Sequence, residues 1–217
     1  MNNFYKKAAA FVTLWMTCVA LTMWIVGCSP NLESSPKDSP DSAANTDSSS
    51  QVVTDPESGP NPVTWTDCGQ TPGEHPCDFT FVDQSGNAWT LYDHIGKVIV
   101  IDFSTMWCGV CNNIASKGDE FMQTYNMQNF VWVTVLVEDS TRNPPDADDL
   151  THWVDTYNIS APVLAGNRAD VVDLTAETGY PITAWPTLVV IDRNMVLYRG
   201  INGWNEAVVT QWVEEVL

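Results

Sequence analysis

Residues 98–111 read VIVIDFSTMWCGVC and join an apolar run to two cysteines that are separated by two residues. The first six are apolar apart from Asp102, and four of them are β-branched, a composition typical of a strand buried on both faces of a sheet. We expect a helix to follow over residues 108–123. Unpaired N–H groups at a helix start stabilise an anion, so the Cys108 thiolate should be favoured, while burial should keep Cys111 protonated. The pattern predicts one nucleophilic thiol and one resolving thiol.

The segments on either side predict an α/β fold with a central mixed sheet flanked by helices. Apolar and alternating runs bounded by turn residues indicate two hairpins and a second buried strand, and apolar residues at helical spacing indicate further helices. Asn205 is the expected N-cap of the last helix. The expected strands cover Phe79–Asp83, Trp89–Leu91, Phe130–Val137, Thr187–Asp192 and Met195–Tyr198, and the other expected helices cover Asp148–Tyr157 and Ala169–Thr178.

The N-terminus has the pattern of an export signal. Lys6-Lys7 precede an apolar run over Ala8–Val26, which leads into the sequence IVGC ending at Cys28. This ending resembles the lipobox of bacterial lipoproteins, in which the chain is cut before the cysteine and the cysteine is lipidated. We therefore assign residues 1–27 to a signal peptide and Cys28 to lipidation. An uncleaved anchor is the alternative, because a run of this length forms a helix of about 28 Å, enough to cross a bilayer.

A change of composition divides the rest of the chain in two. Residues 29–64 consist mainly of Ser, Pro, Asp, Asn and Thr, and such a segment cannot bury enough apolar surface to offset its ordering entropy. We therefore assign residues 28–64 to the lipidated cysteine and a disordered tether, and residues 65–217 to one domain.

The charge of the chain restricts its partners. The 217 residues include 27 acidic and 9 basic ones, for a formal net charge of −18, and the phosphates of a nucleic acid would repel such a chain. From Trp65 onward there are 21 acidic and 6 basic residues, a balance that favours basic partners. We expect no nucleic-acid partner.

Residues 100–111 resemble the active site of the thioredoxin superfamily, with its strand, acid and CxxC motif. Ala184-Trp185-Pro186-Thr187 precedes a predicted strand, as the cis-proline loop of that superfamily does. Phe79-Thr80-Phe81 and Gly96–Val100 narrow the resemblance to the TlpA/ResA-like group, which is related to the AhpC/TSA redoxins. Proteins of that group are membrane-tethered, extracytoplasmic thiol–disulfide oxidoreductases. The resemblance implies a thioredoxin-like fold with an N-terminal β-hairpin extension.

The resemblance also implies catalytic roles. Cys108 would attack a partner disulfide, and Cys111 would resolve the mixed disulfide that forms. Asp102 would accept the proton of Cys111, directly or through a water, and desolvation should raise its pKa toward neutrality. A buried aspartate with a purely structural role is the alternative.

Substrate binding is expected from residues around the nucleophile and the cis-proline, namely Trp107, Gly109, Val110, Trp185 and Pro186. A cis bond before Pro186 would let the backbone of Trp185 pair with a substrate strand. Two features depart from the common pattern: Val110 stands where related sites have proline, and Trp185 is bulky for its position. The strand expected over Phe130–Val137 also lacks the lysine that pairs with the buried acid in thioredoxin.

Cys68 and Cys77 lie outside these motifs, in a stretch rich in Gly and Pro. In an oxidising compartment, two such cysteines predict a structural disulfide. The alternative is a second redox pair that exchanges with Cys108 and Cys111, which is disfavoured because no helix start would stabilise a thiolate there.

Three other functions use similar residues. A thiol peroxidase would need proline where Ile101 stands, although Thr105 fits its motif. A Sco-like copper-binding chaperone would need three residues between its cysteines and a distant histidine, whereas the three histidines are expected to be ordinary surface or loop residues (His75, His94 and His152). A zinc site of four thiols is disfavoured by the long gap after Cys68.

The expected partners follow from the resemblance. They are disulfide-containing exported proteins, such as apocytochromes c, and a membrane thiol electron donor of the DsbD or CcdA type. No cofactor and no metal are expected. The lipid anchor would hold the domain in the cell envelope or periplasm, and Ser29 after the lipidated cysteine indicates the outer membrane in a bacterium that has two membranes.

Overall fold

The computed structural model describes residues 63–125 and 129–217. The predicted signal peptide 1–27, the lipidation site Cys28 and the tether up to residue 62 lie outside the described residues. Within the described ranges, no helix is both long enough and apolar enough to cross a membrane. These ranges contain the segment in which we expect the redox domain.

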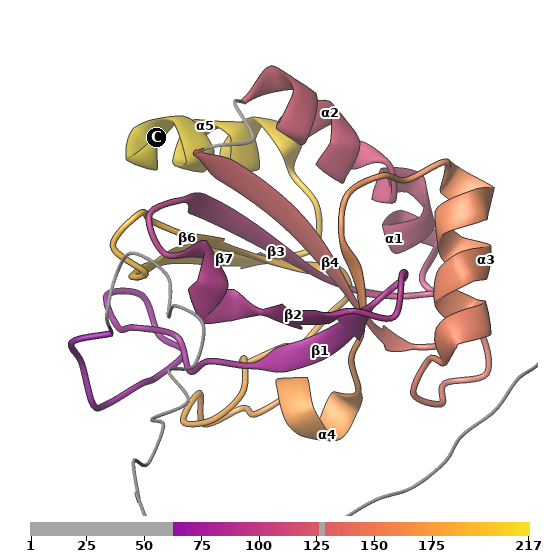
Figure 1. The fold of residues 1–217 in the computed structure, drawn as a ribbon, viewed down its shortest axis with the longest axis horizontal. Coiled ribbons are helices and arrows are strands. Elements are labelled where there is room, and N and C mark those ends of the chain that lie inside the picture. Colours follow the sequence, from indigo (N-terminus) through magenta and orange to yellow (C-terminus); the bar gives the residue numbers. More distant parts are fainter. Residues whose placement is uncertain (1–62, 126–128) are drawn as a thin grey trace, which may run out of the picture. The chain divides into compact units, whose positions relative to one another are not determined.

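Seven strands form one mixed sheet in the order β2-β1-β5-β4-β3-β6-β7 (Figure 1). The central strands β3, β4 and β5 are parallel to one another, and antiparallel strands extend the sheet on both sides. This sheet, its helices and the hairpin β1–β2 confirm the predicted fold class. The strands are β1 Thr80–Asp83, β2 Ala88–Thr90, β3 Val98–Thr105, β4 Phe130–Glu138, β5 Val163–Ala165, β6 Thr187–Ile191 and β7 Leu197–Asn202.

The strand β3 lies inside the sheet and is buried along its whole length. Because side chains alternate along a strand, Ile99 and Ile101 pack in the hydrophobic core on one face, while Val98 and Val100 pack in the core on the other. Asp102 shares the second face by the same alternation. The strand therefore carries a carboxyl group into the interior of the protein.

Helices cover both faces of the sheet. Figure 1 shows α2 and α5 together on one side and α4 on the other, in agreement with the packing of α2 and α5 against the core around Val98 and Val100. Asn205 caps α5 as predicted, because its side chain accepts a hydrogen bond from the N–H of Val208. The helices are η1 Leu91–His94 (a 3₁₀ turn), α1 Gly109–Ile114, α2 Lys117–Thr124, α3 Ala147–Tyr157, α4 Arg168–Val171 and α5 Glu206–Val216.

The helix expected over residues 108–123 is broken into α1 and α2. The interruption falls at Ala115 and Ser116, just before Gly118. A Cβ atom on Gly118 would lie 2.6 Å from the Trp132 ring, so α2 approaches β4 too closely for any larger residue. Serine and glycine at this point favour a break in the helix axis.

The helix expected over residues 169–178 is wrong beyond its first turn. The helix α4 ends at Val171, and a turn follows in which the Asp173 carboxylate accepts hydrogen bonds from three backbone N–H groups between residues 175 and 178. An aspartate that captures backbone donors in this way competes with the helix for them. The short strand β5 was not predicted, and β7 begins at Leu197 because Met195 lies in the preceding turn with a positive φ of 57°.

Candidate active site

The two cysteines of the CxxC motif lie where β3 ends and α1 begins. Cys108 is the N-cap of α1, and its Sγ atom accepts a hydrogen bond from the backbone N–H of Cys111 at 3.2 Å. Both cysteines are free thiols, and Cys108 retains 8% exposure whereas Cys111 has none. Only the first cysteine can therefore meet a partner directly.

Cys111 is held in its protonated form. Burial raises the pKa of its thiol far above the ordinary value, and the neighbouring Cys108 sulfur and the charge of Asp102 raise it further. This agrees with the expectation that burial keeps Cys111 protonated. A thiol of this kind needs a base before it can act as a nucleophile.

Asp102 is the buried carboxyl group next to the pair. Burial raises its pKa from 3.8 to about 7, although hydrogen bonds from Ser104 and Thr134 oppose part of that rise. The Ser104 hydroxyl donates at 2.7 Å, and the Thr134 hydroxyl, from the paired position on β4, donates at 3.4 Å. The strand β4 contains no lysine, and the hydrogen bonds to this acid come from the two hydroxyl groups. A carboxyl group with a pKa near 7 can accept and release a proton at neutral pH.

The loop before β6 contains the expected cis-proline. The peptide bond between Trp185 and Pro186 is cis, as the sequence predicts. The Asn202 side chain at the end of β7 holds this loop, because its oxygen accepts hydrogen bonds from the backbone N–H groups of Thr183 and Ala184 at 3.0 and 3.3 Å. Sequence reasoning missed Asn202, since no motif surrounds it.

A cleft of about 380 Å³ opens beside Cys108. The turn before α1 and the segment before the cis-proline both contribute to it. Gly109 and Val110 are exposed at the start of α1 without lining this cleft. The structure thus brings Trp107 and Trp185 together with Cys108. The residues that line the cleft are Trp107, Cys108, Arg168, Ile182, Thr183, Ala184 and Trp185.

A buried carboxylate at the end of β4 links the two sides of this cleft. Glu138 accepts a hydrogen bond from Trp107 Nε1 at 2.7 Å and another from Arg168 Nε at 2.6 Å. Burial would raise the pKa of Glu138, but these two hydrogen bonds and the charges of Arg168 and Arg142 outweigh it and hold the pKa below its ordinary value. Sequence reasoning missed both charged residues. One signal in the sequence could have indicated Glu138: a charged residue directly follows the apolar run 130–137, at the same end of the expected strands as the CxxC motif.

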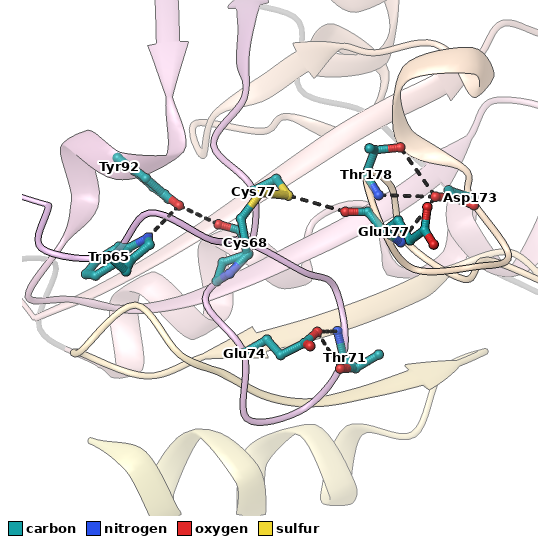
Figure 2. Close-up of a disulfide and its surroundings, with 10 residues drawn as sticks. Trp65, Cys68, Thr71, Glu74, Cys77, Tyr92, Asp173, Glu177 and Thr178 are labelled. Carbon is teal, nitrogen blue, oxygen red and sulfur yellow. Dashed lines mark hydrogen bonds between the residues drawn. A yellow bond between two sulfur atoms is a disulfide. The ribbon is translucent and has the colours of Figure 1, made fainter.

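Cys68 and Cys77 form the expected disulfide and lie apart from the cleft. Figure 2 shows the surroundings of this disulfide, where the Cys77 sulfur lies 3.6 Å from the carbonyl oxygen of Glu177. On the other side, Tyr92 donates its hydroxyl proton to the carbonyl of Pro76 at 2.7 Å (Figure 2). The bond thus closes a loop that contacts two other parts of the domain.

The histidines lie in three different settings. His75 stacks on Trp65, and His94 stacks on Trp89, where burial lowers its pKa to about 4. His152 is exposed on α3. Among the described residues, no group of three or more His, Cys, Asp or Glu side chains lies close enough together to hold a metal ion. The disulfide also removes two of the four thiols that a zinc site would need.

Comparison with known proteins identifies the family. The sequence profile of the AhpC/TSA family matches residues 72–199, a range that contains the CxxC motif, Asp102 and the cis-proline. The chain belongs to the AhpC/TSA family. In this AhpC/TSA protein, the match also includes Glu138, Arg168 and the first half of β7.

Relatives and solved structures share the thioredoxin-like fold. The thioredoxin-like protein YneN of Bacillus subtilis (strain 168) is 22% identical over 125 residues, which are 58% of this chain and 68% of that protein. A putative thiol:disulfide interchange protein DsbE from Chlorobium tepidum aligns with a TM-score of 0.54 at 21% identity, over 68% of this chain and 98% of that one. The pneumococcal exposed lipoprotein thioredoxin of Streptococcus pneumoniae aligns with a TM-score of 0.51 at 20% identity, over 64% and 99% of the two chains. Fold and family together class this chain as a thioredoxin-like thiol–disulfide oxidoreductase.

Proposed function

We propose that the protein is an extracytoplasmic thiol–disulfide oxidoreductase in which Cys108 is the nucleophile, Cys111 the resolving thiol and Asp102 the proton acceptor. The observation that carries the proposal is the combination of a thiol at the cleft with a buried thiol and a buried carboxyl group whose pKa is about 7. The first thiol can meet a partner, and the carboxyl group can activate the second.

In the reducing direction, the Cys108 thiolate bonds to one sulfur of a partner disulfide. The partner's sulfur–sulfur bond breaks, and its other sulfur leaves as a thiolate that takes a proton from water. Asp102 then accepts the proton of Cys111, and the Cys111 thiolate attacks Cys108. The remaining partner sulfur departs and takes the proton from Asp102. Two electrons have passed to the partner, and Cys108 and Cys111 are joined as a disulfide.

Residues around the cleft would bind the substrate. The backbone of Trp185, next to the cis bond of Pro186, would pair with an extended segment of the partner. Trp107 lines the cleft beside the nucleophile, and Gly109 with Val110 presents an exposed surface at the start of α1. A partner chain that crosses the cleft would contact all of these groups.

The cellular setting is proposed from the N-terminal sequence. The leader 1–27 and Cys28 would place the domain outside the cytoplasm on a lipid anchor, with residues 29–64 as its tether. The pneumococcal structural neighbour is itself an exposed lipoprotein, which supports this setting. The partners would be exported proteins with disulfides, apocytochromes c among them, and electrons would come from a membrane thiol carrier of the DsbD or CcdA type.

The reduction potential of the Cys108–Cys111 pair tests the proposal. The full chain is equilibrated with thiol–disulfide buffers, and alkylation of each cysteine is followed by mass. A value of about −270 mV, as in thioredoxin, supports a reductant, whereas one of about −120 mV, as in DsbA, would indicate a protein that forms disulfides. A pair that does not cycle would contradict the proposal. Peroxide consumption and copper content of the same sample test the peroxidase and copper-chaperone alternatives.

A further inference from the structure

The cleft beside Cys108 carries a positive charge in an acidic domain. Arg168, the first residue of α4, lines this cleft together with Trp107 and Trp185. Among the described residues that line it, Arg168 is the charged one. Residues 65–217 contain only 6 basic residues against 21 acidic ones, so composition alone would not predict an arginine at this place.

Two contacts hold the Arg168 guanidinium in position. Its Nε atom donates to Glu138, and its Cζ atom lies 5.4 Å from the centroid of the Trp185 ring, within the range of a cation–π interaction. The other oxygen of Glu138 accepts from the Trp107 indole. Arg168 is therefore tied to both aromatic walls of the cleft, which limits the entropy that it would lose on binding a ligand.

The guanidinium still has donors to offer. Arginine carries five N–H donors, and Glu138 engages the one on Nε. Within residues 63–125 and 129–217, no second acceptor is hydrogen-bonded to Arg168, and the side chain is 53% exposed. Its Nη groups are thus free to bind a ligand.

A second arginine lies next to this cleft. Arg142 lies over the Trp107 ring at 4.2 Å from its centroid, so two arginines surround the one carboxylate of Glu138. The nearest acids in sequence are engaged by their own loops: Asp139 accepts hydrogen bonds from the backbone of residues 141 and 143, and Asp170 accepts one from Asn167. A carboxylate that entered the cleft would meet donors on arginine.

We propose that Arg168 determines specificity by binding a carboxylate next to the disulfide that Cys108 attacks, so that preferred substrates are protein disulfides flanked by Asp or Glu. The inference rests on the proposed oxidoreductase function and names its substrate class. A guanidinium of fixed orientation matches the geometry of a carboxylate, whereas a lysine or arginine beside the substrate disulfide would meet like charge.

The test uses the reduced full chain and three peptides. Each peptide has one internal disulfide, and they differ only in whether Glu, Gln or Lys follows the first cysteine. Stopped-flow measurement gives a second-order rate constant for each. A charge-assisted hydrogen bond should make the Glu peptide react about five- to tenfold faster than the Gln peptide, with the Lys peptide slowest.

Variants of Arg168 test whether this residue causes the preference for the Glu peptide. In Arg168→Gln, the ratio of Glu to Gln rate constants should fall to one or below, because the negative chain then repels the Glu peptide. Arg168→Lys keeps the charge and should keep part of the ratio. Arg193→Gln is the matched control: Arg193 is exposed in the turn after β6, at the opposite end of the sheet from Thr105, and the ratio should not change.

The readout separates this inference from the function on which it rests. Because each ratio compares two peptides on the same variant, a general loss of activity or packing cancels. Equal rates for the Glu and Gln peptides, or a preference that survives in Arg168→Gln, would overturn the inference and leave the oxidoreductase function standing. If the native chain reduced none of the peptides, the proposed function and this inference would fail together.

Discussion

The two cysteine pairs of this domain have different surroundings. Cys68 and Cys77 are joined across a surface loop, and the neighbours of this loop are backbone carbonyls and a tyrosine hydroxyl. Cys108 and Cys111 are free thiols at the end of a buried strand, with Asp102 beside them. At the Cys108–Cys111 pair, a partner can reach the first thiol, and a carboxyl group that can act as a base lies beside the second. If the proposed function holds, neighbouring groups, more than the cysteines themselves, separate the redox pair from the structural cross-link.

Replacing the nucleophile should give the largest difference between the pairs. Cys108→Ser is expected to lower the rate of disulfide reduction by about a thousandfold or more. Enzymes whose catalytic residues act together lose activity on this scale when the nucleophile is replaced. The matched control, Cys68→Ser with Cys77→Ser, should keep a rate close to that of the native chain. Both are measured with a peptide disulfide under single-turnover conditions. A large loss in the control would assign the second pair to the reaction.

The pH dependence of stability should reveal the raised pKa of Asp102. Because the pKa of Asp102 is raised to about 7 in the folded state, the folded chain keeps a proton that the unfolded chain releases above about pH 4. Stability should therefore fall as the pH rises from about 4 to 7. Raising the pKa from 3.8 to about 7 corresponds to a loss on the order of 4 kcal/mol.

The variant Asp102→Asn lacks this titration. Its free energy of unfolding should change less with pH, so that it becomes more stable than the native chain at about pH 8 but not at about pH 4. Urea denaturation at several pH values measures both curves. Parallel curves for the two proteins would contradict the raised pKa and, with it, the role of Asp102 as a proton acceptor.

The parts of the site that the sequence predicts are those with local patterns. The apolar run before Asp102, the CxxC motif and the Trp185–Pro186 dipeptide are each short stretches of consecutive residues. The structure places all three along β3 or close to its C-terminal end. The N-cap Asn205 is local in the same sense. Such features depend on near neighbours in the chain, so a single sequence contains enough information for them.

The parts that the sequence does not predict depend on contacts between distant segments. The helix α2 lies so close to β4 that only glycine fits at position 118 against Trp132, and Arg168 is held at the cleft by Glu138, 30 residues away in the sequence. Asn202 holds the cis-proline loop from the end of the next strand. No local pattern in the sequence pairs these residues.

Removing the disulfide should lower stability more than activity. Cys68 and Cys77 are nine positions apart, and cross-linking a loop of this size stabilises a domain by about 3 kcal/mol when the unfolded chain loses that much entropy. The double serine variant should therefore melt roughly 5–10 °C below the native chain. Thermal unfolding with the CxxC pair kept reduced measures the effect. Equal melting temperatures would contradict a structural role for this bond.

The smallest expected effect concerns the hydroxyl groups that partner Asp102. Ser104 donates to this carboxyl group at 2.7 Å and lowers its pKa, and it also lowers the pKa of Cys111. In Ser104→Ala both groups should hold their protons more tightly, so the resolution of the mixed disulfide should reach half its maximal rate at a higher pH. Loss of a hydrogen bond to a charged group, at about 1.5 kcal/mol, corresponds to a displacement of roughly one pH unit.

The matched variant is Thr134→Val, which has nearly the same volume and removes a longer contact of 3.4 Å to the same carboxyl group. Its displacement should have the same direction and be smaller, because a hydrogen bond weakens with distance. Stopped-flow measurement of the resolution step across the pH range gives both profiles. If neither variant moved the profile, Asp102 would not control the proton of Cys111, and the difference between the two cysteine pairs would rest on access to the nucleophile alone.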